Sequence, residues 1–471
     1  METHELSSAV VKPRRVGLRW LKRFALALLV AVDVPAIRQV WHHYKVTTKL
    51  QETLGEMDRA EPGWRLDEIE AHREQIPDGE NGARVVSEAG KLLSRDWPPK
   101  EIAEIINRAR GNEPLEPEEL RRLTKELDAQ RPALEEARKL SFLSKGRHHI
   151  EYARDILGTL LKDQSKVPLV TLLLLGDALR HEELANSHEA LLSCRAAFSA
   201  GRSIGDEPLA VSQLIRKRSI VLCCRGIERA LARGNPSPVV LSELQKLLVE
   251  EDEFPDLMVC ARGERAAWQT MFEAMENGEI SPSDRGDWKA ILSGPIFRDQ
   301  LREEHPLMLK LSNRWLTITL LPPEEQVQGE QQLQFTVDHL PDSARMTRSI
   351  MVPAVAIVGR SSRNKHALLR CTVAALAAER YRKQRQSWPD SLNHLCPLFL
   401  PAGPRDPHDG EILRYRRLDD GVLIYSVGPD RINNNGNLDP KNPNPPGTDI
   451  GIRLWDAAQR HQAPPENRKV R

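Results

Sequence analysis

The chain has 471 residues, of which 40% are hydrophobic and 29% are charged. This length predicts more than one domain, since single cores rarely grow past about 250–300 residues, and the composition is typical of a helix-rich globular protein. The formal net charge of +1 excludes a global field that would recruit nucleic acid. The sequence also holds no DNA- or RNA-binding motif, so we expect no nucleic-acid partner.

The first domain that we expect, residues 1–45, has the pattern of a targeting segment. Six Lys and Arg residues within residues 12–23 precede the apolar run Phe24–Val32, which Asp33 interrupts. The run suits a signal-peptide hydrophobic region of about 7–15 residues better than a spanning helix of about 20. Three interpretations stay open: a signal peptide, an uncleaved anchor through residues 24–41, and an ordinary amphipathic helix.

Either of the first two interpretations places the N-terminus in the cytoplasm and the bulk of the chain outside, because basic residues stay on the cytoplasmic side of a membrane. We therefore expect an inner-membrane protein with a periplasmic bulk. A secreted protein and a cytoplasmic protein are the alternatives.

We expect residues 46–349 to form a helical domain. Pro117 occupies the favoured first position of a charged helix, and the polar stretch Gln326–Arg348 suits either a linker or an exposed helix. Such helical hairpins resemble a tetratricopeptide-type solenoid, but the 34-residue consensus is absent, so a plain bundle is an equal alternative. Apolar residues recur at helical spacing in four consecutive segments, namely Ile150–Leu161, Val167–Leu184, Glu189–Ala200 and Leu209–Ala232.

No catalytic signature accompanies these helices. HExxH, GxSxG and P-loop motifs are absent, although His148, His149 and Glu151 stand together in the chain. The six cysteines form neither a C-x-x-C pair nor a zinc pattern, and burial as small hydrophobic residues is the favoured interpretation. A disulfide between Cys371 and Cys396 stays open. We expect a protein that is not an enzyme.

We expect residues 350–456 to form a small α+β domain and residues 457–471 to form a disordered tail. An amphipathic helix precedes the turn at Trp388-Pro389. Asp-Gly turns bracket the strand candidate Ile412–Arg416, and Val422–Ser426 is the second strand candidate. The predicted fold is therefore mostly α, with a body of helical hairpins or a helical bundle. A long helix and a short antiparallel sheet would form its C-terminal part.

The loop after the second strand is dense in side-chain oxygens. Ser426, Asp430, Asp439 and Asp449, with several Asn residues between them, place hard ligands within a short stretch. Calcium takes six to eight oxygens from flexible loops of this kind. The spacing does not match an EF-hand, however, and a solvated Asn/Pro loop is the favoured alternative.

The C-terminal segment ALAAERYRKQRQSWPDSL…DPHDG…YSVGPD…GTDIGIRLW resembles the globular part of the major pseudopilin of the type II secretion system. That family has a helix with a Tyr-Arg-like end, a Trp-Pro or Tyr-Pro turn, an Asp-Pro turn and a sheet. The resemblance covers about 95 of the 471 residues. The matching positions are Ala374–Arg382, Trp388-Pro389, Ser391-Leu392, Asp406-Pro407, Gly410, Tyr415, Tyr425–Asp430 and Asp449-Ile450.

In pseudopilins of this kind the terminal loop binds calcium. The resemblance therefore implies calcium ligands at Ser426, Asp430 and Asp449 and at a backbone carbonyl near Tyr425, with Asp439 as a possible addition. This chain departs from the family in two ways. It carries a longer insertion in that loop, and the domain lies behind some 350 residues of helix rather than behind its own assembly helix. We therefore do not expect a pseudopilus.

The whole layout is similar to a large group of uncharacterised bacterial envelope proteins. We accordingly expect a non-enzymatic envelope scaffold with an unidentified protein partner, attached to the membrane through residues 24–41. A cytoplasmic helical-repeat binding protein and an envelope hydrolase are the alternatives.

Overall fold

The computed structural model describes residues 16–280, 295–438 and 446–460, without the side chains of residues 16–36, 295–300 and 352–354. The helices are α1 (Val16–Ala60), α2 (Leu66–His72), α3 (Gly82–Leu92), α4 (Lys100–Arg108), α5 (Pro117–Ala129), α6 (Arg131–Arg138), α7 (Val167–Glu183), α8 (Ser187–Arg202), α9 (Ala210–Arg233), α10 (Pro238–Asp252), α11 (Asp256–Glu276), α12 (Pro295–Thr319), α13 (Pro323–Asp338) and α14 (Arg345–Arg385). The strands are β1 (Arg414–Leu418), β2 (Gly421–Ser426) and β3 (Ile450–Trp455).

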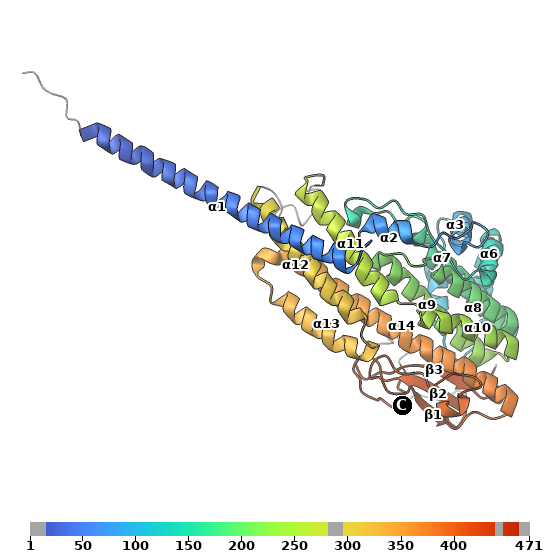
Figure 1. Ribbon diagram of the computed structural model, residues 1–471. Coiled ribbons are helices and arrows are strands. Elements are labelled where there is room, and N and C mark those ends of the chain that lie inside the picture. The colour runs from blue at the N-terminus through green and yellow to red at the C-terminus, as the bar shows by residue number, and fades with distance from the viewer. Residues whose placement is uncertain (1–15, 281–294, 439–445, 461–471) are drawn as a thin grey trace, which may run out of the picture.

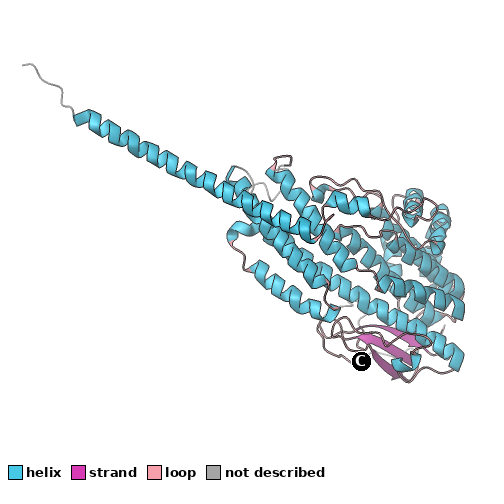
Figure 2. Cartoon of the chain, in the orientation of Figure 1, coloured by secondary structure: helices cyan, strands magenta, loops and turns pink. Residues whose placement is uncertain are grey.

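The predicted fold class is confirmed, since most of the described chain is helical and the strands gather near the C-terminus (Figures 1 and 2). The sheet has the order β1-β2-β3 and is antiparallel throughout. Asp419 and Asp420 form the tight turn between β1 and β2, and Gly421, with φ of +157°, begins β2. The sheet packs on α14, so a long helix and a short sheet form the C-terminal part.

Strong apolar periodicity predicted three consecutive helices correctly: α7, α8 and α9 lie within a few residues of their expected ranges. The open choice at Gln326–Arg348 is resolved as helix α13 followed by the start of α14.

The helix predicted at Ile150–Leu161 is wrong, because this stretch is irregular apart from a 3-10 turn at Ile156–Gly158. Its apolar residues do not share one buried face: Ile156 is buried, whereas Leu157 and Leu160 are exposed.

Helix α1 is one continuous 45-residue element, and its N-terminal part stands out from the rest of the molecule (Figure 1). It ends at the Pro62-Gly63 turn, where Gly63 adopts φ of +81°. The next residue, Trp64, is fully buried against Met57 and Leu309. Its Nε1 donates to Asp58 at 2.8 Å, so the turn fixes the end of α1 to the body.

Within the described part of the chain, no helix combines the length and apolar content that a membrane crossing requires. The side chains of the apolar run Phe24–Val32 lie outside that part.

The buried hydrophobic residues form two large clusters that meet along α14. Met351 and Val355 belong to the cluster with α11, α12 and α13. Leu368 and Leu376 belong to the cluster that α7 to α10 share with the sheet. The domain boundary expected at residue 350 therefore falls inside one helix, and the division into two folding units stays a prediction.

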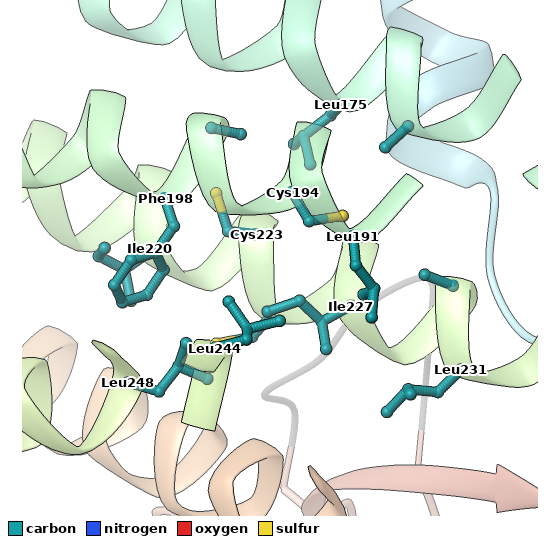
Figure 3. Packing of buried hydrophobic residues seen from close by; sticks show 14 of the residues in the cluster. Leu175, Leu191, Cys194, Phe198, Ile220, Cys223, Ile227, Leu231, Leu244 and Leu248 are labelled. Carbon is teal, nitrogen blue, oxygen red and sulfur yellow. The ribbon is translucent and has the colours of Figure 1, made fainter. Parts of the chain in front are cut away.

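Most cysteines act as small apolar residues in these clusters. Figure 3 shows Cys194 of α8 and Cys223 of α9 among leucine, isoleucine and phenylalanine side chains. All six cysteines are free thiols and five are buried. Cys371 and Cys396 therefore form no disulfide here.

The tail expected after residue 456 is held at its start. Arg460 is buried, and its guanidinium contacts both carboxylate oxygens of Glu379 at 2.9 and 3.0 Å. Residues 461–471 lie outside the described residues.

A buried group of charges joins four helices. Glu251 of α10 and Asp256 of α11 are withdrawn from solvent, as are Lys217 of α9 and Lys365 of α14. Lys217 Nζ lies 3.1 Å from Asp256, and Lys365 Nζ lies 3.7 Å from each carboxylate. Burial alone would raise the pKa values of both carboxyls, but the surrounding cations hold them below their usual range. Both acids therefore remain charged and paired.

Glu264 of α11 is a buried acid in a different situation. Its Oε1 accepts the backbone N–H of Ala210, the first residue of α9, at 2.9 Å. Burial raises the pKa of Glu264 to about 7. Between about pH 4.5 and pH 7 the folded protein therefore keeps a proton on Glu264 that the unfolded chain releases. This proton stabilises the folded state fully below pH 4.5, and its contribution is lost as the pH rises through 7.

We predict that Glu264→Gln removes this pH dependence, because the amide still accepts from Ala210 but never ionises. Above pH 8 the free energy of unfolding of the variant should exceed that of the wild type by about 2 kcal/mol, and near pH 5 the two free energies should agree. Urea unfolding between pH 5 and pH 8.5 measures the difference. Identical pH slopes for the two proteins would contradict the prediction.

Candidate functional site

The Asp-Pro turn at residues 406–410 anchors the end of the sheet. Asp406 is fully buried, and its carboxylate accepts the Ser426 hydroxyl at 2.8 Å and the backbone N–H groups of His408 and Val427 at 2.9 Å. Burial raises the pKa of Asp406 above its usual range. One buried carboxylate thus joins the turn to the end of β2, in agreement with the turn predicted here.

Ser426, a proposed metal ligand, belongs to this anchor. It is buried, donates its hydroxyl proton to Asp406 and accepts the N–H of Gly428 at 3.1 Å. Its oxygen therefore serves the packing of the loop against the sheet.

Asp430 and Asp449 close the long loop from two sides. The carboxylate of Asp430 accepts the N–H groups of Ile432 at 3.0 Å and Gly447 at 2.8 Å. The carboxylate of Asp449 accepts those of Asn434 at 3.3 Å and Gly436 at 2.7 Å. The loop thus has its own backbone donors for the two acids that sequence reasoning selected.

The two acids differ in their titration. Burial acts to raise the pKa of Asp430, but the backbone donors outweigh it and hold that pKa below its usual range. Burial raises the pKa of Asp449. A cation beside Asp449 would lower its pKa and favour the ionised form.

A calcium ion fits the described residues in part. Asp430 and Asp449 each keep further lone pairs for a cation, and calcium would take its other oxygens from amides and backbone carbonyls. In residues 16–280, 295–438 and 446–460, no three His, Cys, Asp or Glu side chains gather as a metal group. Asp439, the fourth proposed ligand, lies outside these ranges, so calcium binding stays a prediction.

Comparison with protein-family models, with curated proteins and with solved structures found no significant match to this chain. The relationship of the C-terminal part to pseudopilins accordingly stays a prediction.

A second candidate site lies on α1. Four apolar side chains are between 62% and 71% exposed there, and we call them the α1 stripe: Ile37, Val40, Trp41 and Tyr44. Their spacing of three and four residues places them on one helix face. Sequence reasoning placed Ile37, Val40 and Trp41 in the anchor candidate of residues 24–41 but did not identify this stripe, although the spacing was visible.

The opposite side of α1 faces the body. Val46 is buried, and His42 Nε2 lies 2.8 Å from Glu303 of α12. The α1 stripe is therefore a solvent-facing surface on a helix whose other face is already packed.

We predict that Asp406→Ala destabilises the protein by about 3 kcal/mol or more, because it leaves three buried donors without their acceptor. Asp419→Ala, which removes an exposed acid from the same part of the chain, is the matched control and should cost less than about 0.5 kcal/mol. Chemical unfolding of both variants tests this. Equal losses would show that the carboxylate is not an anchor.

We predict that calcium slows amide hydrogen exchange at Asn434, Gly436 and Gly447 in the full-length chain, since an ion between the two acids would hold the loop closed. At 100 times its dissociation constant, calcium should add about 2.7 kcal/mol to the stability of the closed loop. Asp449→Ala should abolish the calcium effect and Asp419→Ala should not. Exchange rates that are the same in calcium and in chelator would remove the metal from this loop.

Proposed function

We propose that the protein is a non-enzymatic scaffold of the cell envelope, held at a membrane by α1 and binding a partner protein through its helical body and C-terminal part. The observation that carries the proposal is the α1 stripe, an exposed apolar surface on a helix that stands out from the body (Figure 1). Contiguous apolar surface of this kind marks contact with a membrane or a protein.

The length of the helix supports a membrane as the partner of α1. The stretch from Phe24 to Tyr44 is about 30 Å long at 1.5 Å per residue, which is comparable to the hydrocarbon core of a bilayer. Basic residues precede this stretch, and Trp41 and Tyr44 close it. Trp and Tyr favour the membrane–water interface, and basic residues favour the cytoplasmic side.

The charges inside this stretch leave two forms of membrane attachment for α1. Asp33 and Arg38 weaken a full crossing. A helix that lies in the interface plane with its apolar face in the lipid is the other form. In both forms the body remains in water and the stripe contacts lipid.

The body suits the role of a scaffold. Helices α7, α8 and α9 each pack against the other two, and packed helices of this kind can present broad binding surfaces. The calcium-binding loop, as proposed, would keep the C-terminal surface ordered.

We predict that the full-length protein floats with vesicles of phosphatidylethanolamine and phosphatidylglycerol. Leu28→Glu with Leu29→Glu should abolish flotation, and Val40→Glu with Tyr44→Glu should reduce the bound fraction at least threefold. The control is Val239→Glu with Phe335→Glu, which adds the same charge at equally exposed apolar positions on the body. Flotation that survives both α1 variants, or that the control reduces equally, would refute attachment through α1.

A reporter enzyme that is active only outside the cytoplasm, fused after residue 45, tests the compartment. Activity supports the envelope assignment. Inactivity, with the fusion intact, would leave the cytoplasmic binding protein.

A further inference from the structure

Three basic side chains follow one side of α1 next to the α1 stripe. Arg38, Lys45 and Lys49 are all exposed, and we call them the α1 basic ridge. At 3.6 residues per turn they lie within about 40° of one another around the helix axis. The same geometry places Trp41 of the stripe about 60° from the middle of the ridge. The basic ridge and the apolar stripe are therefore neighbours on one solvent-facing surface.

The α1 basic ridge lies between the stripe and the side of the helix that packs on the body. Val46 and Thr53 are buried, and they lie about 70° further round the helix than the middle of the ridge. The other flank of the stripe carries Thr47 and Gln51, which are neutral. Positive charge thus borders the stripe on one side, so any surface that covers the stripe meets the ridge along that edge.

The ridge lacks acidic partners within the part of the chain that the structure describes, because none of its three side chains forms an ion pair there. Lys45 Nζ lies 5.4 Å from the centre of the Trp41 ring, and this cation–π contact holds the charge beside the stripe. By contrast Arg65, just beyond the end of α1, is paired with Asp58 at 2.7 Å. The charges of the ridge therefore remain available to an anionic partner.

The positive charge is a local feature of α1. The whole chain carries a formal net charge of only +1, and the same flank becomes acidic after Lys49, at the exposed Glu52 and Glu56. Salt screens exposed charges beyond a distance of about 8–10 Å, so the ridge and the two acids act on different parts of a nearby surface. An anionic surface is attracted by the turns before Glu52 and repelled by those after it.

A bilayer that contains anionic lipids matches both features of this surface. Its acyl chains accept the apolar stripe, and its phosphates lie just outside them. Long basic side chains reach such phosphates while their stems stay on apolar surface. The ridge spans about 16 Å of helix and brackets Trp41, so headgroups are within its reach in either form of attachment. A nucleic acid or a soluble acidic protein would supply anions without the apolar layer.

We propose that the α1 basic ridge binds the phosphate groups of anionic phospholipids, so that α1 selects an anionic membrane surface over a neutral one. This inference rests on the proposed attachment through α1 and adds the class of lipid that is recognised. Each Lys or Arg close to an anionic leaflet strengthens binding about fivefold, and three together about a hundredfold. The stripe supplies affinity for lipid, and the ridge supplies the preference for anionic headgroups.

The test measures partition of the full-length protein onto vesicles of phosphatidylcholine, alone or mixed with an equal part of phosphatidylglycerol. The variant that combines Arg38→Gln, Lys45→Gln and Lys49→Gln should bind the mixed vesicles about a hundredfold less tightly than the wild type. Its binding to phosphatidylcholine alone should be unchanged. The basic residues that precede Phe24 are the same in both proteins, so the difference belongs to the ridge.

Two control variants separate charge from folding and from net charge. Arg38→Lys with Lys45→Arg and Lys49→Arg keeps the three charges and should keep the preference for phosphatidylglycerol. Neutralising three exposed basic residues of α5, α10 and α14 changes the net charge equally and should leave binding unaltered. These substitutions are Lys125→Gln, Lys246→Gln and Arg345→Gln. All variants should unfold as the wild type does, since exposed side chains contribute little to stability.

Equal binding of the wild type to both kinds of vesicle would overturn the lipid preference and leave attachment through α1 standing. Binding to neither kind would overturn both proposals. An equal loss in the body control would assign the effect to net charge and overturn the role of the ridge. Binding of soluble polyglutamate as tight as that of mixed vesicles, and unchanged by Val40→Glu with Tyr44→Glu, would assign the ridge to an acidic protein instead.

Discussion

The structure depends most on the withdrawal of Glu251 and Asp256 from solvent. A buried carboxylate requires a cation at a defined place, since an unpaired one costs several kcal/mol. Arg216 of α9 supplies that charge to Glu251 and Lys217 of α9 supplies it to Asp256, while Lys365 of α14 lies near both acids. A shift of α14 by one residue would move Lys365 away from both acids. Electrostatics therefore sets a register that apolar packing alone would leave loosely defined.

The position of α14 in turn determines how the C-terminal part meets the body. Arg363, close to Lys365 on the same helix, forms a two-pronged ion pair with Glu330 of α13 at 2.7 and 2.8 Å. This contact needs Gly359, where an added Cβ would lie 2.1 Å from Glu330 Oε1. The second half of α14 carries the sheet on one side and α9 and α10 on others. The sheet is therefore continuous with the helical core rather than tethered to it.

The elements that sequence reasoning predicted well are those whose apolar pattern is local. Helices α7 to α9 and the hairpin of β1 and β2 follow from spacing and Asp-Gly turns. The helix predicted at Ile150–Leu161 failed because side chains of this segment make contacts far along the chain. Tyr152 donates to Glu207, and Ile156 packs in the core. The boundary expected at residue 45 falls inside α1, because polar residues in the middle of this helix concealed its continuity.

The candidate sites, too, could be predicted only where their residues lie close together in the sequence. The acids Asp430 and Asp449 were visible as a cluster in the chain. The capture of Ser426 by Asp406, which precedes it by 20 residues, was not visible, because no local pattern pairs them. Such chemistry requires three-dimensional proximity and a hydrogen-bond direction, neither of which a sequence motif records.

Helix α1 has one more consequence, which is geometric. It is a single helix from Val16 to its fixed end beside the buried Trp64. Every residue of an α-helix adds 1.5 Å of length and 100° of rotation. The number of residues between an attachment point and Trp64 therefore sets both the height of the body and the side that it turns toward that surface. Insertion of a single residue would alter the height very little but would rotate the whole body by more than a quarter turn.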